Sequence, residues 1–291
     1  MDISHQDIQT NGVSLHVAAC GPKDAPLVIL LHGFPEYWGA WESHMRLIAA
    51  KGYLVIAPDQ RGYNTSDKPR RMRDYSLDLL AEDIVGLIEH HHRQQARIVG
   101  HDWGGAVAWH VARVHPERLA RLVVINCPPT DVFRRFALRH PGQLLRSWYI
   151  VAMQIPWVMR WALTRRNFAK TRRTMRRSSK PGTFDAQALA GHMAAWAQPD
   201  AFRSMINWYR AAIWRPPRRS REMIEVPTLL LWGERDRFLS KGLVKPSLAA
   251  CADARAVRYP EATHWLQHEQ PDAVVDEMLE FFGEDVKGED E

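Results

Sequence analysis

The chain has 291 residues, long enough to bury about three quarters of the surface of the unfolded chain in one large core. Hydrophobic residues make up 46% and charged residues 25% of the sequence, which is typical of globular proteins and excludes disordered and fibrous classes. The net charge of +6 is unevenly distributed, because residues 131–222 hold 19 Lys and Arg against 4 Asp and Glu, a net charge of +15, and the remainder carries −9. This asymmetry indicates two separately built parts.

Several classes of location and partner receive no support from the sequence. The N-terminal residues are polar and unlike a secretory signal, so we expect a cytoplasmic protein. The longest apolar stretch, residues 148–163, contains a proline and an arginine and is too short for a membrane span. Cys20, Cys127 and Cys251 match no metal or disulfide spacing, so we expect no metal and no cofactor. The basic region lacks any nucleic-acid-binding motif, and we expect no nucleic-acid partner.

The first 130 residues predict a sheet covered by helices. Asn11-Gly12 lies between two alternating segments and predicts an antiparallel hairpin. Short continuous apolar runs then alternate with amphipathic patterns, which is typical of a parallel sheet with helices on both faces. The predicted strands are 27–31, 52–58, 97–100 and 121–126, and the predicted helices are 37–51, 76–92 and 103–115. The same alternation resumes with strands 226–233 and 255–259 and helix 272–282.

Residues 131–222 interrupt this alternation. They carry no strand signal and are rich in helix formers, aromatic residues and arginine. We therefore predict a helical cap domain, residues 131–222, inserted into a core domain formed by residues 1–130 and 223–291. Ligands of open parallel sheets bind at the carboxyl ends of the strands, so a cap that follows strand 121–126 would cover that edge.

The sequence GHDWGG, residues 100–105, joins a predicted strand to a predicted helix and carries Asp102 at its centre. The Gly-x-Asp-x-Gly spacing is that of a nucleophile elbow, in which small neighbours let the central side chain project into an active site. The N–H groups of the helix N-terminus would keep a carboxylate ionised. The same spacing also occurs at ordinary helix N-caps, and its position directly after a buried strand favours the catalytic interpretation.

Two downstream residues complete a predicted catalytic triad with Asp102. Asp236 follows strand 226–233, and His264 follows strand 255–259. This is the order nucleophile, acid, histidine that is typical of folds with a nucleophile elbow. The acid would fix the tautomer and the orientation of the histidine. Glu234 is the alternative acid, and His268 is the alternative base.

The loop HGFPEYW, residues 32–38, follows the first parallel strand. On an elbow fold, one oxyanion-hole N–H comes from this loop and the other from the residue after the nucleophile. We therefore predict that the N–H groups of Phe34 and Trp103 stabilise a developing oxyanion. Without the elbow, the same loop would be interpreted as a tight turn.

The motifs HGFPEYW, DQRGYNTSDKP (residues 59–69), GHDWGG, NWYR (residues 207–210), GERD and ATHW together resemble those of the epoxide hydrolases of the α/β-hydrolase fold. The resemblance spans nearly the whole chain, and it implies a mostly parallel sheet flanked by helices with an inserted helical cap. It also implies that two cap tyrosines hold and protonate the epoxide oxygen. These are Tyr209 in NWYR and Tyr149, which is placed by its Tyr-x4-Gln-x-Pro spacing. In relatives the peptide bond before the proline equivalent to Pro35 is cis.

The expected reaction has two halves. A carboxylate is anionic at neutral pH, so Asp102 needs no base to attack the epoxide carbon and form an ester. His264, held by Asp236, then activates the water that hydrolyses this ester to a vicinal diol. A haloalkane dehalogenase uses the same nucleophile and is the alternative, although a departing halide would not need Tyr149 and Tyr209. A non-catalytic binding protein that kept the pocket is a third hypothesis.

The expected substrate is a small hydrophobic epoxide, and the protein is expected to be a monomer or a homodimer. The residues predicted to contact the substrate are His32, Pro35, Trp148, Ile150, Met153 and Trp208. The Arg-rich stretch 164–177 lies among apolar residues and allows two interpretations. It forms either a solvated face of the cap or a site of weak, reversible contact with an anionic membrane.

Overall fold

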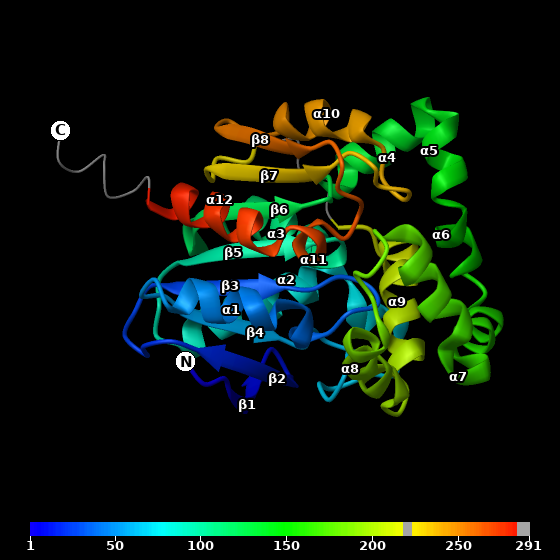
Figure 1. Cartoon of the computed structure of the whole chain (residues 1–291), viewed down its shortest axis with the longest axis horizontal. Coiled ribbons are helices and arrows are strands. Elements are labelled where there is room, and N and C mark those ends of the chain that lie inside the picture. The colour runs from blue at the N-terminus through cyan, green and yellow to red at the C-terminus, as the bar shows by residue number, and fades with distance from the viewer. Residues whose placement is uncertain (218–222, 284–291) are drawn as a thin grey trace.

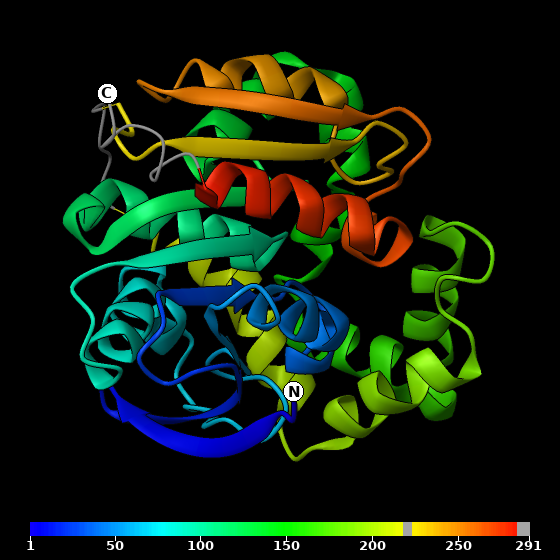
Figure 2. The same cartoon turned by 60° about the vertical axis from the view of Figure 1, so that its left-hand side comes forward.

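The computed structural model describes residues 1–217 and 223–283. Within these ranges the chain forms an eight-stranded sheet of order β1-β2-β4-β3-β5-β6-β7-β8, with helices on both faces and further helices beyond one edge (Figures 1 and 2). The strands are β1 Ser4–Thr10, β2 Val13–Cys20, β3 Leu27–Leu31, β4 Leu54–Pro58, β5 Ala96–His101, β6 Leu119–Ile125, β7 Thr228–Gly233 and β8 Ala254–Tyr259. The predicted α/β fold is confirmed.

The sheet is antiparallel only at its N-terminal end in the described part of the chain. β1 and β2 form the predicted hairpin, and the turn residues Asn11 and Gly12 have positive φ angles of 44° and 73°. β2 also pairs antiparallel with β4, and the pairs from β3–β4 to β7–β8 are parallel. Both φ values match the two-residue turn that an Asn-Gly pair favours.

Helices cover both faces of the sheet, which explains why its central strand β3 is apolar at every position. In β3, Leu27, Ile29 and Leu31 face one hydrophobic core with α2 and α3, whereas Val28 and Leu30 face a second core with α1 and α12. The covering helices are α1 Glu42–Ala49, α2 Leu77–His90, α3 Trp103–Val114, α10 Val244–Leu248, α11 Leu266–Glu269 and α12 Pro271–Gly283. Short 3₁₀ turns lie at Trp38–Trp41, Met72–Tyr75, Pro116–Arg118 and Lys241–Leu243. A strand buried on both faces needs no polar alternation.

Helices also form the segment between β6 and β7. They are α4 Thr130–Arg139, α5 Pro141–Arg146, α6 Trp148–Ala152, α7 Pro156–Ser178, α8 Ala186–Ala197 and α9 Ala201–Trp214. Figure 1 shows them at the carboxyl ends of the strands, where the sequence predicted a cap. The backbone of α7 leaves helical geometry at residues 165–168. Residues 218–222, which the prediction assigned to the cap, lie outside the described residues.

Buried hydrogen bonds join the cap to the core. The indole N–H of Trp196 on α8 donates to the main-chain oxygen of Pro35, and that of Trp208 on α9 donates to the oxygen of Arg61 at 2.9 Å. Each satisfies a polar group that would otherwise be buried alone. In the described part of the chain, no helix combines the length and the apolarity needed to cross a lipid bilayer.

Candidate active site

Asp102 lies at the tip of a strained turn between β5 and α3. Its φ and ψ angles are 49° and −119°, a conformation that is rare for residues with a side chain. A Cβ atom on Gly100 would lie 2.4 Å from the main-chain oxygen of Gly104, and one on Gly104 would lie 2.2 Å from that of Leu31. Glycine at both positions therefore lets the backbone approach closely enough for Asp102 to project into the site.

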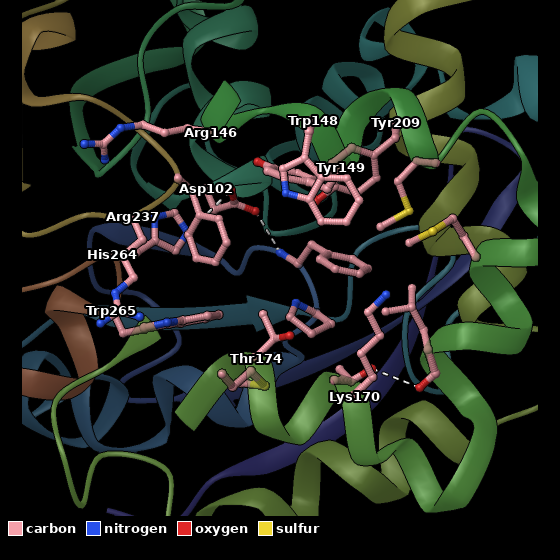
Figure 3. A pocket seen from close by; sticks show the side chains of 18 of the residues that line it. Asp102, Arg146, Trp148, Tyr149, Lys170, Thr174, Tyr209, Arg237, His264 and Trp265 are labelled. Atoms are coloured by element: carbon pink, nitrogen blue, oxygen red, sulfur yellow. Dashed lines mark hydrogen bonds and ion pairs between the residues drawn. The ribbon is translucent and has the colours of Figure 1, made fainter. Parts of the chain in front are cut away.

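Asp236 and His264 form a hydrogen-bonded pair, and His264 forms an ion pair with Asp102. His264 Nδ1 donates to Asp236 Oδ2 at 2.7 Å, and His264 Nε2 lies 3.6 Å from Asp102 Oδ2. The other oxygen of Asp236 accepts from the main-chain N–H groups of Phe238 and Leu239 at 2.7 and 2.9 Å. The imidazole is thus fixed between the two carboxylates, with its Nε2 directed at Asp102. Figure 3 shows His264 and Asp102 at the same end of the cavity.

The alternative acid and base lie elsewhere. Glu234 forms ion pairs with Lys241 and Arg258. His268 Nε2 contacts Glu36 Oε1 at 2.6 Å. Among the described residues, neither Glu234 nor His268 contacts Asp102. The geometry therefore favours Asp236 as the acid and His264 as the base.

The ionisation of this chain is set by opposing effects. Burial lowers the pKa of His264, but Asp236 and Asp102 outweigh it and raise the pKa to about 10. Burial raises the pKa of Asp102, but the bond to His264 and the charges of His264 and His101 lower it overall. At neutral pH these shifts favour a protonated His264 beside an ionised Asp102.

We predict that Asp102→Asn lowers the pKa of His264, because one of the two carboxylates that hold the proton is removed. The raised pKa means that the ion pair stabilises the fold fully below the ordinary histidine value of 6.5 and that this stabilisation is lost as the pH rises towards 10. In Asp102→Asn, the stabilisation by protonated His264 should be lost at a lower pH than in the parent protein. Titration of His264 by NMR in both proteins measures the shift, and an unchanged pKa would contradict the assigned coupling.

The predicted oxyanion donors are placed differently with respect to Asp102. The N–H of Phe34 donates to Asp102 Oδ1 at 3.0 Å, and the Phe34–Pro35 bond is cis, as the resemblance implies. Trp103 begins α3, where the first N–H groups of a helix have no partner within it. The main chain of Phe34 therefore contacts the carboxylate of Asp102 directly, and Trp103 offers a helix N-terminal donor next to it.

Tyr149 and Tyr209 bring two phenols from the cap to the same cavity. Tyr149 lies on α6 and Tyr209 on α9, and their rings meet edge to face with centroids 5.9 Å apart. Both line the cavity that contains Asp102, and Figure 3 shows them side by side near its carboxylate. Burial and the negative charge of Asp102 raise the pKa of both phenols above the usual 10.0, so both are protonated at neutral pH.

The cavity around these residues has a volume of about 330 Å³. Its lining is mostly apolar and includes Pro35, Trp148 and Met153, three of the predicted substrate contacts. Ile150 lines a smaller neighbouring cavity of about 90 Å³, which also contacts Asp102. Such an apolar lining with a few convergent polar groups is typical of small-molecule sites.

His32 and Trp208 lie outside both cavities, in contrast to the sequence prediction. His32 is fully buried, and its Nε2 accepts a hydrogen bond from the main-chain N–H of Gln60 at 3.2 Å. Trp208 is held by Arg61 and packs edge-on against Tyr63 at 5.3 Å. Both side chains therefore support the loops beneath the site instead of contacting a substrate.

Sequence reasoning missed three polar residues that hold the site in place. Asn126 Nδ2 donates to Asp236 Oδ2 at 2.9 Å, and its position at the end of β6 is a signal that could have identified it. His101 lies 2.9 Å from both Glu36 Oε2 and the main-chain oxygen of His264. Burial opposes ionisation of Glu36, but His101 and His268 hold its pKa well below the ordinary value. This network fixes the backbone that carries His264.

Known proteins resemble the chain over nearly its full length. The α/β-hydrolase fold family model matches residues 26–271. The AB hydrolase superfamily protein YfhM of Bacillus subtilis is 41% identical over 94% of this chain and 96% of its own. Human epoxide hydrolase 4 is 35% identical over 97% of this chain and 79% of its own.

Solved structures give the same result. The crystal structure of Bacillus megaterium epoxide hydrolase in complex with an inhibitor has a TM-score of 0.89 and 28% sequence identity, and the match covers 96% of this chain and 100% of that one. The family model, the sequence identities and the structural match all extend over most of the chain. The chain belongs to the α/β-hydrolase fold family and, within it, to the group of the epoxide hydrolases.

Proposed function

We propose that this protein hydrolyses a hydrophobic epoxide to a vicinal diol through an ester at Asp102. One observation supports this most strongly: the carboxylate of Asp102 shares a largely apolar cavity with two protonated phenols, Tyr149 and Tyr209. A carboxylate attacks saturated carbon without prior deprotonation, and a phenol donates a proton to the oxygen that leaves. The relatives named epoxide hydrolase support the same reaction.

In the first half-reaction, Asp102 forms a bond to one epoxide carbon while the carbon–oxygen bond of the ring breaks. The oxygen takes a proton from Tyr149 or Tyr209, and the phenolate regains one from His264 through solvent. Loss of the negative charge on Asp102 removes one of the two groups that raise the pKa of His264. Ester formation thus converts the imidazolium into a neutral base at the moment when a base is required.

In the second half-reaction, His264 takes a proton from a water molecule that attacks the ester carbonyl. The N–H groups of Phe34 and Trp103 hold the oxyanion. When this intermediate collapses, the departing alkoxide takes the proton of the new carboxyl group. The diol leaves, and the pair of imidazolium and carboxylate is restored.

The test of the proposed reaction is a panel of epoxides and haloalkanes, assayed for diol and halide release. We expect diol from hydrophobic epoxides and no halide. Release of halide alone would replace the proposal with a dehalogenase, and release of neither product would replace it with a binding protein. The cytoplasmic location and the monomeric or homodimeric state stay predictions.

We predict that Tyr149→Phe and Tyr209→Phe each slow ring opening and that the double variant loses about 10²–10⁴-fold in kcat, the usual contribution of general acid catalysis. Single-turnover kinetics should place the loss in formation of the ester, not in its hydrolysis. Tyr259→Phe is the matched control, because Tyr259 lines neither of the two cavities described above. Its hydroxyl lies 3.5 Å from the main-chain oxygen of Ala273 on α12. A double variant that turns over epoxide at the parent rate would remove the phenols from the mechanism.

A further inference from the structure

The outer side of the cap carries a row of exposed apolar side chains. Leu145 is 76% exposed, Trp157 73%, and Trp148 and Trp161 59% each. They lie on α5, α6 and the first part of α7, which follow one another along the outer edge of the cap (Figure 1). We define the outer apolar face as Leu144, Leu145, Trp148, Val151, Ile155, Trp157, Val158 and Trp161, all of which are exposed.

Exposed apolar residues recur at short intervals through these three helices. Leu144, Trp148, Val151, Ile155 and Val158 recur every three or four residues along a chain that is mostly helical. Within a single helix, residues at such spacing share a face, as Trp148 and Val151 do on α6 and Trp157 and Trp161 do on α7. Single exposed apolar residues are ordinary on protein surfaces, but contiguous exposed patches mark interaction sites.

The catalytic cavity opens at this face. Leu145 and Trp148 line the cavity that holds Asp102, although more than half of each side chain is exposed. A side chain that borders both the cavity and the solvent lies at the mouth of the cavity. A substrate that enters there must therefore pass across the outer apolar face.

The segment that carries this face has charged residues of a single sign. Residues 132–184 contain 13 Lys and Arg and no Asp or Glu. Within the described chain, Arg135 is the only one of the thirteen that pairs with a carboxylate, that of Asp131. Arg165 lies over the ring of Trp161 at 4.1 Å from its centroid. Lys170 is exposed and lines the cavity. The segment that carries the face is therefore apolar on its exposed side and rich in cations, and the carboxylate of Asp200 lies within electrostatic range of Arg160.

This combination selects one kind of partner. A second copy of the chain would bring two cationic surfaces together, which like-charge repulsion disfavours. A nucleic acid would match the charge but would leave leucine, valine and isoleucine side chains without a suitable contact. An anionic lipid bilayer satisfies both properties, because its headgroups attract arginine and its interface accommodates tryptophan and leucine.

We infer that the outer apolar face docks on the surface of an anionic lipid bilayer and that hydrophobic epoxides enter the cavity directly from the lipid. The docking stands on the exposure and charge of the cap alone. The entry of epoxides rests on the proposed function. Docking and catalysis can therefore be tested separately.

The test of docking is co-sedimentation with vesicles of pure phosphatidylcholine and with vesicles of equal parts phosphatidylcholine and phosphatidylglycerol. We expect binding to the anionic vesicles, and loss of it at high salt because the Debye length shortens. Trp157→Ser combined with Trp161→Ser should weaken binding about tenfold or more, since two amphipathic rings leave the interface. Arg160→Gln and Arg165→Gln should each weaken it about fivefold. Leu47→Ser, an exposed apolar change on α1, is the matched control and should bind like the parent.

The test of substrate entry compares a water-soluble epoxide with one dissolved in the same vesicles. The variant with both Trp157→Ser and Trp161→Ser should release diol from the soluble epoxide at the parent rate. With the vesicle-bound epoxide, its rate of diol release should fall about tenfold, in proportion to its lost binding.

Absence of vesicle binding, or equal binding by the tryptophan variant, would overturn the inference. A parent dimer that the tryptophan changes dissociate, without vesicle binding, would assign the face to a second copy. Vesicle binding without diol release from either epoxide would refute the proposed function and retain the docking.

Discussion

His264→Gln is expected to accumulate the ester at Asp102 and to lower kcat by about 10²–10⁴-fold, the usual contribution of a general base. Asp102 is ionised without help from a base, so the first half-reaction continues in the variant. The second half-reaction stops, because among the described residues His264 is the only side chain that contacts both Asp236 and Asp102. Intact-mass spectrometry after exposure to substrate should show the mass of the whole epoxide on the peptide that contains Asp102.

The variant should remain folded. Asp236 keeps the N–H groups of Phe238 and Leu239 and the amide of Asn126 as donors, and a glutamine amide at position 264 can supply a further one. An adduct that has lost a halide would support the dehalogenase alternative. An active variant with no adduct would show that another group activates the water.

The second large effect is expected at the nucleophile itself. Asp102→Ala should lower kcat by at least about 10⁴-fold, because loss of a covalent nucleophile leaves only binding and oxyanion stabilisation. It should also form no adduct under the conditions in which His264→Gln does. The measurement is diol release under steady-state conditions, together with intact mass.

Asp78→Ala is the matched control for this change. The Asp78 side chain lies on α2, is more than half exposed and pairs with His110 away from the cavity. Both variants remove one carboxylate, so only an effect on the reaction distinguishes them. Comparable activity of the two variants would rule out Asp102 as the nucleophile.

Most strands and helices of the core were predictable because their signals are local. The run LVILL coincides with β3, since a strand covered on both faces must be apolar throughout. Other boundaries shifted by a few residues. The strand predicted from residue 52 begins at Leu54, because Gly52 adopts a positive φ of 89° in the preceding turn. The helix predicted from residue 37 begins with a 3₁₀ turn at Trp38–Trp41.

The sequence by itself determined the elbow and the order of the chemical groups. Gly100 and Gly104 identify the turn because any larger residue would collide with the backbone there. Asp236 and His264 follow strands whose carboxyl ends meet at one edge, and that property depends only on the strands being parallel.

Only the tertiary structure decided which side chains touch. It selected Asp236 over Glu234, placed Asn126 beside Asp236, and moved His32 and Trp208 from the cavity into supporting contacts. It also left the apolar side of α5, α6 and α7 uncovered, which an amphipathic pattern alone does not reveal. A local pattern specifies which face of an element is apolar, whereas the partner of a side chain depends on packing between segments that are far apart in the chain.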